Sequence, residues 1–166
     1  MSPPLKPLVV SGDTNHSDKQ IKWDNRFLEL CELLASWSED PSRKVGAVIV
    51  GSAHTILSTG YNGLPRGISH LDESRLSREE GKKYHWIEHA ERNAIYNAVR
   101  NGVTLDGATM YASLFPCSDC ARGIIQSGIS TLVTRGIPKN EIRFAQSMAT
   151  SIEMFQEAKV HLRLYE

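Results

Sequence analysis

The sequence predicts one α/β domain with three layers, in which a five-stranded mixed sheet carries helices on both faces. Two runs with β-branched residues, 44–50 and 55–61, are separated by a very short connection, which is typical of a hairpin. The rest of the chain alternates between helical and strand-like segments, as expected when parallel strands are joined by right-handed helical crossovers. With 166 residues, 40% of them hydrophobic, the chain can bury one substantial core.

The first expected helix runs from Trp23 to the segment SEDPS, residues 38–42. Its apolar side chains recur at helical spacing: Phe27, Leu30, Cys31, Leu34 and Trp37. Because Cys31 lies on this apolar face, we expect a buried thiol there. Residues 1–20 are rich in Pro, Ser, Asp and Lys and are expected to form a flexible N-terminal arm, which leaves residues 21–166 for the domain.

After the hairpin, a long polar loop covers residues 62–86, and loops of this length in a compact domain are usually functional or disordered. Alternating segments follow to the end of the chain. Helices are expected at 89–101, 117–128 and 144–159, and strands at 108–114, 130–134 and 160–165. This pattern predicts five strands and about five helices.

Charge and composition exclude several classes of function. The 19 basic and 19 acidic side chains balance, so the overall charge favours neither a nucleic-acid partner nor an anionic membrane. No apolar run approaches the roughly 20 residues that span a bilayer, and the N-terminus lacks the apolar stretch of a secretory signal. We therefore expect a cytoplasmic protein. Two of its three cysteines form C-x-x-C, which favours metal or redox chemistry over a disulfide framework.

Two segments that begin helices carry residues suited to one metal site. His89 and Glu91 are two positions apart, so their side chains converge only on a point beyond the N-terminus of their helix. Cys117 and Cys120 share one face at the start of another helix, just after Pro116. If the two helix ends meet, one imidazole and two thiolates are good ligands for Zn²⁺.

The number of protein ligands indicates what such a zinc ion does. A structural zinc site is closed by four protein side chains, whereas a catalytic site keeps one position for water. With His89, Cys117 and Cys120 as the three ligands, Glu91 can act beside that water as a general base and later as a general acid. This combination suits the hydrolysis of an amino group on an aromatic ring. A C-x-x-C alone is more often redox-active or structural, and the H-x-E segment argues against both alternatives.

Four segments, residues 38–50, 58–67, 89–95 and 114–129, together resemble the deoxycytidylate (dCMP) deaminase family over roughly residues 25–135. Their H-x-E and P-C-x-x-C pattern is the general signature of zinc deaminases. The resemblance implies a cytidine deaminase-like fold, one catalytic zinc per subunit and hydrolysis of dCMP to dUMP and ammonia, a step that supplies dTTP precursors. Residues 133–146 (VTRGIPKNEIRFAQ) depart from the tyrosine-containing segment of many members, so the reaction type is better supported than the base.

The resemblance also implies contacts with the substrate. A backbone amide near Ala90 holds the pyrimidine carbonyl, and carbonyls near Ser113 or Leu114 receive the leaving amine. Asn62 binds the 3′-hydroxyl of the sugar, although Asn62 followed by Gly63 is also a good turn pair.

Other candidates for substrate binding come from their positions beside the motifs. Arg43, Lys44 and Arg66 flank the first two expected strands and could bind the phosphate, with ordinary surface cations as the alternative. His85 and Trp86 precede the metal motif and are candidates for the base pocket. The alternatives are a solvated loop residue for His85 and packing beneath the loop for Trp86.

Three functions are compatible with these patterns. The first is a dCMP deaminase that forms a homo-oligomer, a dimer or a hexamer, with dCTP as activator and dTTP as inhibitor, as the resemblance implies for the YNGLPRG region. The second is a deaminase of another small amino-heterocycle or modified nucleotide, purine or pyrimidine, with the same zinc chemistry. The third is a non-catalytic zinc module, against which Glu91 argues because a scaffold has no evident need for an acid there.

Overall fold

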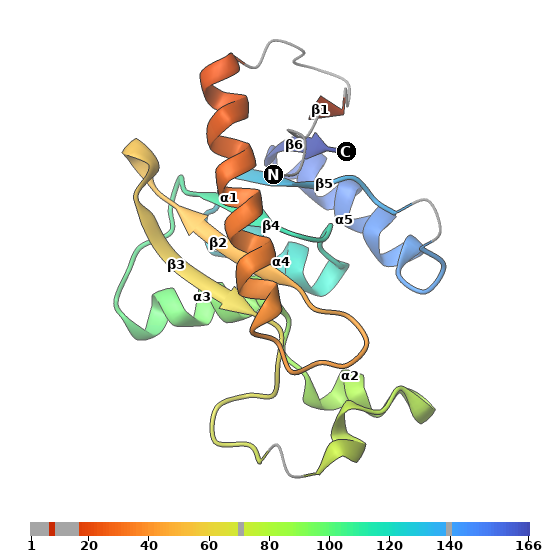
Figure 1. Cartoon of the computed structure of the whole chain (residues 1–166). Helices are drawn as coiled ribbons and strands as arrows, with labels where there is room; N and C mark the ends of the chain where they lie inside the picture. The colour runs from red at the N-terminus through yellow and green to blue at the C-terminus, as the bar shows by residue number, and fades with distance from the viewer. Residues whose placement is uncertain (1–6, 9–16, 70–71, 139–140) are drawn as a thin grey trace.

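A mixed sheet with helices on both faces forms the centre of the computed structural model, which describes residues 7–8, 17–69, 72–138 and 141–166 (Figure 1). Its strands lie in the order β1-β6-β5-β4-β2-β3. The strands are β1 (Pro7–Leu8), β2 (Gly46–Val50), β3 (Ile56–Tyr61), β4 (Thr109–Ala112), β5 (Thr131–Arg135) and β6 (His161–Tyr165). Strands β4, β5 and β6 are parallel, while β2 is antiparallel to both β3 and β4.

The helices agree with the predicted alternation and confirm the three-layer fold. The α-helices are α1 (Asp18–Ser36), α2 (Lys83–Trp86), α3 (Ala90–Arg100), α4 (Ser118–Gln126) and α5 (Ala145–Glu157). The short 3₁₀ helices are η1 (Ser52–His54), η2 (Glu73–Leu76) and η3 (Glu79–Gly81). Among the described residues, none of the helices combines the length and the apolar character that crossing a bilayer requires.

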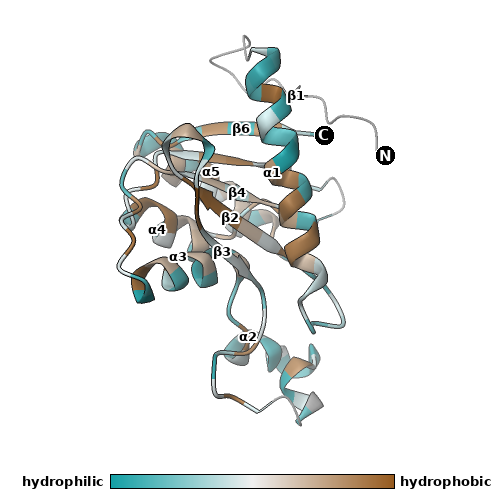
Figure 2. Ribbon diagram, turned by 60° about the vertical axis from the view of Figure 1, so that its left-hand side comes forward, coloured by the Kyte–Doolittle hydropathy of each residue, from teal (hydrophilic) through white to brown (hydrophobic). Residues whose placement is uncertain are grey.

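Alternate residues of β2 explain how both faces of the sheet are covered. Ala47 and Ile49 pack with α3, α4 and α5 on one face, and Val48 and Val50 pack with α1 on the other. All five residues of β2 are buried, as expected for a strand between two helical layers. Figure 2 shows α1 on one side of the sheet and α3 and α4 on the opposite side.

Two glycines bring helices unusually close to the hairpin strands. A Cβ on Gly46 of β2 would lie 2.0 Å from the carbonyl oxygen of Cys31 in α1. A Cβ on Gly60 of β3 would lie 2.4 Å from Ala90 O and from Ala94 N in α3. Real Cβ atoms do not approach backbone so closely, so only glycine allows these two contacts. The start of α3 is therefore set directly by its contact with β3.

A buried carboxylate fastens α1 to its face of the sheet. Asp24 accepts hydrogen bonds from Tyr111 OH at 2.8 Å and Tyr165 OH at 2.7 Å, and from Gln20 Nε2 at 2.8 Å. Arg163 adds a two-pronged contact, with Nε at 2.8 Å and a terminal nitrogen at 3.0 Å. Asp24 is fully buried. The network joins α1 to β4 and β6.

The N-terminal prediction needs two corrections. Helix α1 begins at Asp18 rather than Trp23, because Ser17 caps it by accepting a hydrogen bond from Gln20 N. Residues 17–20 therefore belong to the helix and its cap, and not to the expected arm of residues 1–20. Pro7–Leu8 adds a two-residue edge strand beside β6, outside the five strands expected. Residues 1–6 and 9–16 of the expected arm lie outside the described residues.

Candidate active site

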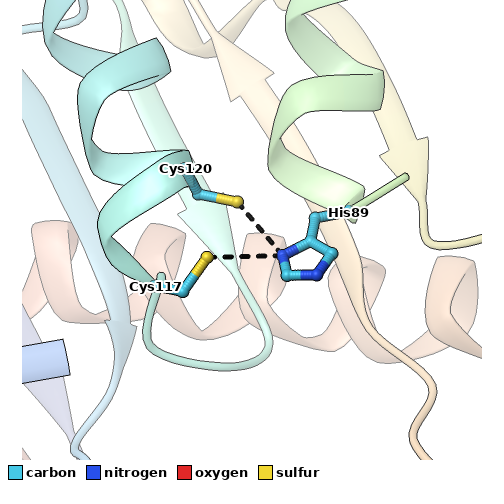
Figure 3. A group of neighbouring side chains, drawn as sticks. All are labelled: His89, Cys117 and Cys120. Atoms are coloured by element: carbon cyan, nitrogen blue, oxygen red, sulfur yellow. Dashed lines mark hydrogen bonds between the residues drawn. The ribbon is translucent and has the colours of Figure 1, made fainter. Parts of the chain in front are cut away.

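Two helix N-termini meet on the α3–α4 side of the sheet, as the spacing of the motifs predicts. His89 is the N-cap of α3, and Cys117 is the N-cap of α4. Cys120 follows in the first turn of α4 and is buried. Figure 3 shows the two sulfur atoms directed at the imidazole of His89.

The spacing of the three side chains fits a tetrahedral zinc ion. Nδ1 of His89 lies 3.5 Å from Cys117 Sγ and 3.4 Å from Cys120 Sγ, and the three possible ligand atoms all lie within 4.8 Å of one another. Zinc bonds of about 2.0 Å to nitrogen and 2.3 Å to sulfur at a tetrahedral angle place the two ligand atoms roughly 3.5 Å apart. The predicted ligands are thus brought together at the separation that zinc requires.

Without a metal ion, the three ligands share protons. A hydrogen bond from Cys120, opposed by burial and helped by His89, lowers the pKa of Cys117 to about 4. The same hydrogen bond and burial raise the pKa of Cys120 well above its ordinary value. Burial lowers the pKa of His89, but its hydrogen bond to Cys117 and the nearby negative charges outweigh this effect and raise it. A divalent cation would replace these protons and hold both sulfurs as thiolates.

Glu91 occupies the second position of α3, beside the three ligands. Its side chain is buried, with 3% of the residue exposed, and it lines the same cavity as His89 and Cys117. Burial raises the pKa of its carboxyl group, with a smaller opposing effect from His89. A carboxyl group that takes up a proton more readily than usual, next to a metal site, has the properties of a general acid and base.

An ion-pair chain connects the starts of the two ligand-bearing helices. Oε1 of Glu88 accepts hydrogen bonds from the backbone N–H of His89 at 3.0 Å and from Nε of Arg92 at 2.5 Å. On its other side, Arg92 lies 3.8 Å from a carboxylate oxygen of Asp119, the residue just before Cys120. These contacts hold the ends of α3 and α4 in a fixed relation around the ligands.

The cavity beside Glu91 contains some of the predicted substrate contacts and several residues that were not predicted. Among the residues predicted to contact the substrate, four line it: Arg43, Asn62, Ala90 and Leu114. Its other lining residues include Asp40, Arg78, Lys83, Tyr84, Phe144 and Met148.

Five predicted contacts do not line this cavity. His85 and Lys44 are exposed, and Trp86 instead supports the long loop, with the guanidinium of Arg75 lying 4.5 Å from its ring centroid. Arg66 is exposed and donates a hydrogen bond to Asn97 on α3, away from the cavity.

Ser113 joins β4 to β2, because its N–H donates to the carbonyl of Gly46 and its hydroxyl accepts from the Gly46 N–H; of the two residues whose carbonyls were predicted to receive the amine, Leu114 lines the cavity. Lys44, Arg66, His85 and Trp86 are likewise outside the lining of this cavity.

Some missed residues of the pocket come from a loop without helical or strand periodicity, and others come from the last helix. Arg78 and Lys83 belong to the polar loop of residues 62–86, in which nothing in the local pattern separates one cation from another. Phe144 and Met148 come from the start of α5, a predicted helix that follows both metal-binding segments in the chain. The positive charge of the loop residues indicates that they could bind an anion. Which of these side chains point into the cavity depends on tertiary contacts.

Comparisons with known proteins agree with this geometry. The zinc-binding region of cytidine and deoxycytidylate deaminases matches residues 21–135. An uncharacterised deaminase from the luxG 3′ region of Aliivibrio fischeri is 39% identical over 142 residues, which cover 85% of this chain and 92% of that relative. Human deoxycytidylate deaminase is 40% identical over 119 residues, which cover 70% of this chain and 66% of the human enzyme.

The fold is also shared with a solved structure. The dCMP deaminase of cyanophage S-TIM5, crystallised with dCMP and dUMP, superposes with a TM-score of 0.69 at 24% sequence identity. The match covers 90% of this chain and 99% of the phage protein. From the family match and the Aliivibrio relative, we conclude that this chain belongs to the cytidine and deoxycytidylate deaminase family and carries its zinc-binding region.

Proposed function

We propose that the protein hydrolyses the amino group of dCMP, with zinc as cofactor, and releases dUMP and ammonia. The observation that carries this proposal is the buried Glu91, in one cavity with the three converging ligand atoms. A purely structural zinc site is closed by four protein ligands and leaves no position for water beside an ionisable carboxyl group. Relatives named deoxycytidylate deaminase support the choice of substrate.

The chemistry can be divided between the metal ion and Glu91. Zinc held by His89, Cys117 and Cys120 would lower the pKa of water and so supply a nucleophile near neutral pH. Glu91 takes up the proton released by water and delivers it to ring N3, which makes C4 more electrophilic. After water oxygen has added at C4, Glu91 takes the second proton from that oxygen and transfers it to the amino nitrogen; the C4–N bond then breaks, ammonia leaves, and the oxygen becomes the C4 carbonyl of dUMP. The raised pKa of Glu91 suits both transfers, because the group must gain and lose a proton in each turnover.

Backbone groups at the ends of two elements suit the two sides of the base. Ala90 is the first residue of α3, where backbone N–H groups have no partner inside the helix, so its amide can hold the pyrimidine carbonyl. The carbonyl of Leu114, just after β4, can accept a hydrogen bond from the leaving amine. Tyr84 and Phe144 pack edge to face at 5.9 Å between centroids and form an aromatic wall of the cavity.

For the phosphate of dCMP, the geometry favours Arg78 together with Arg43. Arg43 pairs with Glu141 at 2.6 Å, which offsets part of its charge. Lys83 is likewise paired with Asp40. Among the described residues Arg78 has no side-chain partner, and its guanidinium can donate to an anion in the cavity that it lines.

The deciding experiment measures ammonia release by the zinc-loaded protein on dCMP, CMP, deoxycytidine, cytosine and a set of purine bases and nucleotides. We expect turnover mainly on dCMP. Replacing Arg78 by Ala should lower kcat/KM for dCMP by about 10- to 100-fold, the equivalent of one or two charged hydrogen bonds, and change deoxycytidine turnover little. Arg100→Ala, at the exposed far end of α3, is the control. Preference for another amino-heterocycle would refute dCMP as the substrate while leaving the zinc chemistry in place.

Assembly and regulation are part of the same proposal. A homo-oligomer, a dimer or a hexamer, is supported by the exposure of Tyr96 (46%) and Val99 (69%), which lie one turn apart on α3. A second cavity between Trp37, Tyr61 and Arg66 is a candidate for dCTP and dTTP as effectors. Light scattering and assays with each triphosphate test both points. The free thiols of all three cysteines agree with a reducing compartment, and we propose the cytoplasm.

A further inference from the structure

A hydrogen bond between two helices lies directly beside the metal ligands. Ser118, the first residue of α4, stands in the chain between Cys117 and Cys120. Its backbone N–H donates to the hydroxyl of Ser147 in α5 at 2.8 Å, and the two serine hydroxyls lie 2.9 Å apart. Ser147 is half-buried. The contact therefore joins the start of the helix that carries both cysteines to the first turn of α5.

The start of α4 needs a hydrogen-bond acceptor from outside the helix. The first N–H groups of a helix have no partner within it, and the side chain of the N-cap residue usually accepts from one of them. Cys117 is the N-cap of α4, but its side chain makes no capping hydrogen bond. Figure 3 shows its sulfur directed at His89 instead. The residue that would cap α4 is thus committed to the metal site, and Ser147 supplies an acceptor from another helix.

The same end of α5 forms one wall of the proposed catalytic cavity. Phe144, the N-cap of α5, and Met148 both line the cavity beside Glu91. They are four residues apart, so they lie on one side of the helix. Ser147 comes between them in the chain and contacts α4. A single turn of α5 therefore carries the cavity wall and the contact with the ligand-bearing helix.

Other contacts of α4 do not set this relation. Phe115 packs edge to face against Phe155 of α5, with 6.4 Å between centroids, but it lies before both cysteines. The contact of Arg92 with Asp119, at 3.8 Å, joins α4 to α3 and not to α5. Apolar packing is not directional, whereas a hydrogen bond requires its donor and acceptor to be aligned. The hydroxyl of Ser147 therefore fixes the segment between the cysteines relative to the wall.

We propose that Ser147 is a positioning residue, which holds Cys117 and Cys120 in a fixed place relative to the wall formed by Phe144 and Met148. A bound zinc ion and the base of the substrate are then kept at the separation that the reaction needs. This inference rests on the proposed function, in which the base lies against this wall. Ser147 acts through the start of α4 and is not itself a metal ligand.

The Ser147→Ala variant tests the proposal, because it removes the acceptor. Alanine has a higher helix propensity than serine, so α5 itself is not weakened. Transfer of zinc from the loaded protein to an excess of a coloured chelator should be about ten-fold faster than in the wild type, because one hydrogen bond to a partly buried N–H is lost. For dCMP we expect kcat to fall about ten-fold. KM should stay within about three-fold, since the wall that binds the base remains.

The matched control is Ser151→Ala, the same change one turn further along α5. The hydroxyl of Ser151 is buried and donates to the carbonyl oxygen of Ser147 within the same helix, at 2.9 Å. This variant should keep the wild-type rate of zinc release and the wild-type kcat. Equal changes in both variants would indicate a general loosening of α5 and would overturn the proposal.

Two further results would also overturn it. One is an unchanged rate of zinc release and an unchanged kcat in Ser147→Ala. The other is a rise in KM alone, which would place the effect of Ser147 on the wall and not on the metal ligands. Zinc release can be measured whether or not the protein turns over dCMP. Absence of dCMP turnover by the wild type would therefore refute the proposed function, while the rate of zinc release still decides whether Ser147 positions the ligands.

Discussion

Replacing Asp24 by Ala should strongly destabilise the fold and leave the active site intact. Asp24 is fully buried and receives five hydrogen bonds, two of them from Arg163. The substitution leaves the guanidinium of Arg163, whose side chain is 11% exposed, without its counter-charge. Removing one partner of a buried ion pair costs about 3–5 kcal/mol. The two tyrosine hydroxyl groups also lose an acceptor, so we place the loss of unfolding free energy within that range and not below it.

Urea unfolding of the zinc-loaded protein, followed by linear extrapolation to water, measures this loss. The Glu32→Gln variant provides the scale for an exposed pair, which should cost about 1 kcal/mol or less. Because the Asp24 network lies on the α1 face of the sheet, the remaining folded protein should keep its zinc content and its kcat. An Asp24→Ala variant within about 1 kcal/mol of wild type would refute this reasoning about a buried charge.

Further predictions concern the site and its surroundings. Glu91→Gln should retain one zinc per chain and lose about 10²- to 10⁴-fold in kcat, the usual contribution of a general acid and base; undiminished turnover would exclude the proton-transfer role. Cys117→Ala should lose zinc, as measured by atomic absorption, and unfold at a lower temperature, whereas wild-type zinc content would remove it from the ligand set. Burial would raise the pKa of Asp40, but hydrogen bonds from Lys83 and Ser42 outweigh it and lower the pKa. A depressed pKa in the folded state contributes stability above the unfolded value of about 3.9, and this stability is lost as the pH falls further. The acid-unfolding profile of Asp40→Asn should therefore be flatter below about pH 4 than that of the wild type, and identical profiles would contradict this ion-pair model.

The regular elements could be predicted from the sequence wherever local pattern and burial agree. Strand β2 is a β-branched run that lies buried between two layers, and its position follows directly from composition. The start of α1 was placed too late, although Ser17 and Gln20 form a recognisable S-x-x-Q capping pattern. Strand β1 could not be found in this way, because two residues carry no periodicity and their pairing with β6 is a long-range contact.

The metal ligands could be predicted because helix geometry constrains them, while the pocket around them could not. His89 and Cys117 occupy the N-cap positions of two helices, and the side chain of an N-cap residue lies at the N-terminal end of its helix. Loop cations have no such constraint. Arg66 and Arg78 belong to the same loop, yet only Arg78 lines the cavity. Trp86 likewise packs against Arg75 because the loop folds back on itself, a contact that a one-dimensional pattern does not contain.

The two glycine contacts in the hairpin have a consequence for how this scaffold can diversify. Gly46 and Gly60 hold α1 and α3 against opposite faces of neighbouring strands with no side chain in between. A larger residue at Gly60 would displace the backbone of α3 beside Ala90, immediately after His89, and with it the metal-binding geometry. New substrate preferences are therefore easier to acquire through the long loop and the segment before α5, where the cavity wall can change while the hairpin and both helices remain in place.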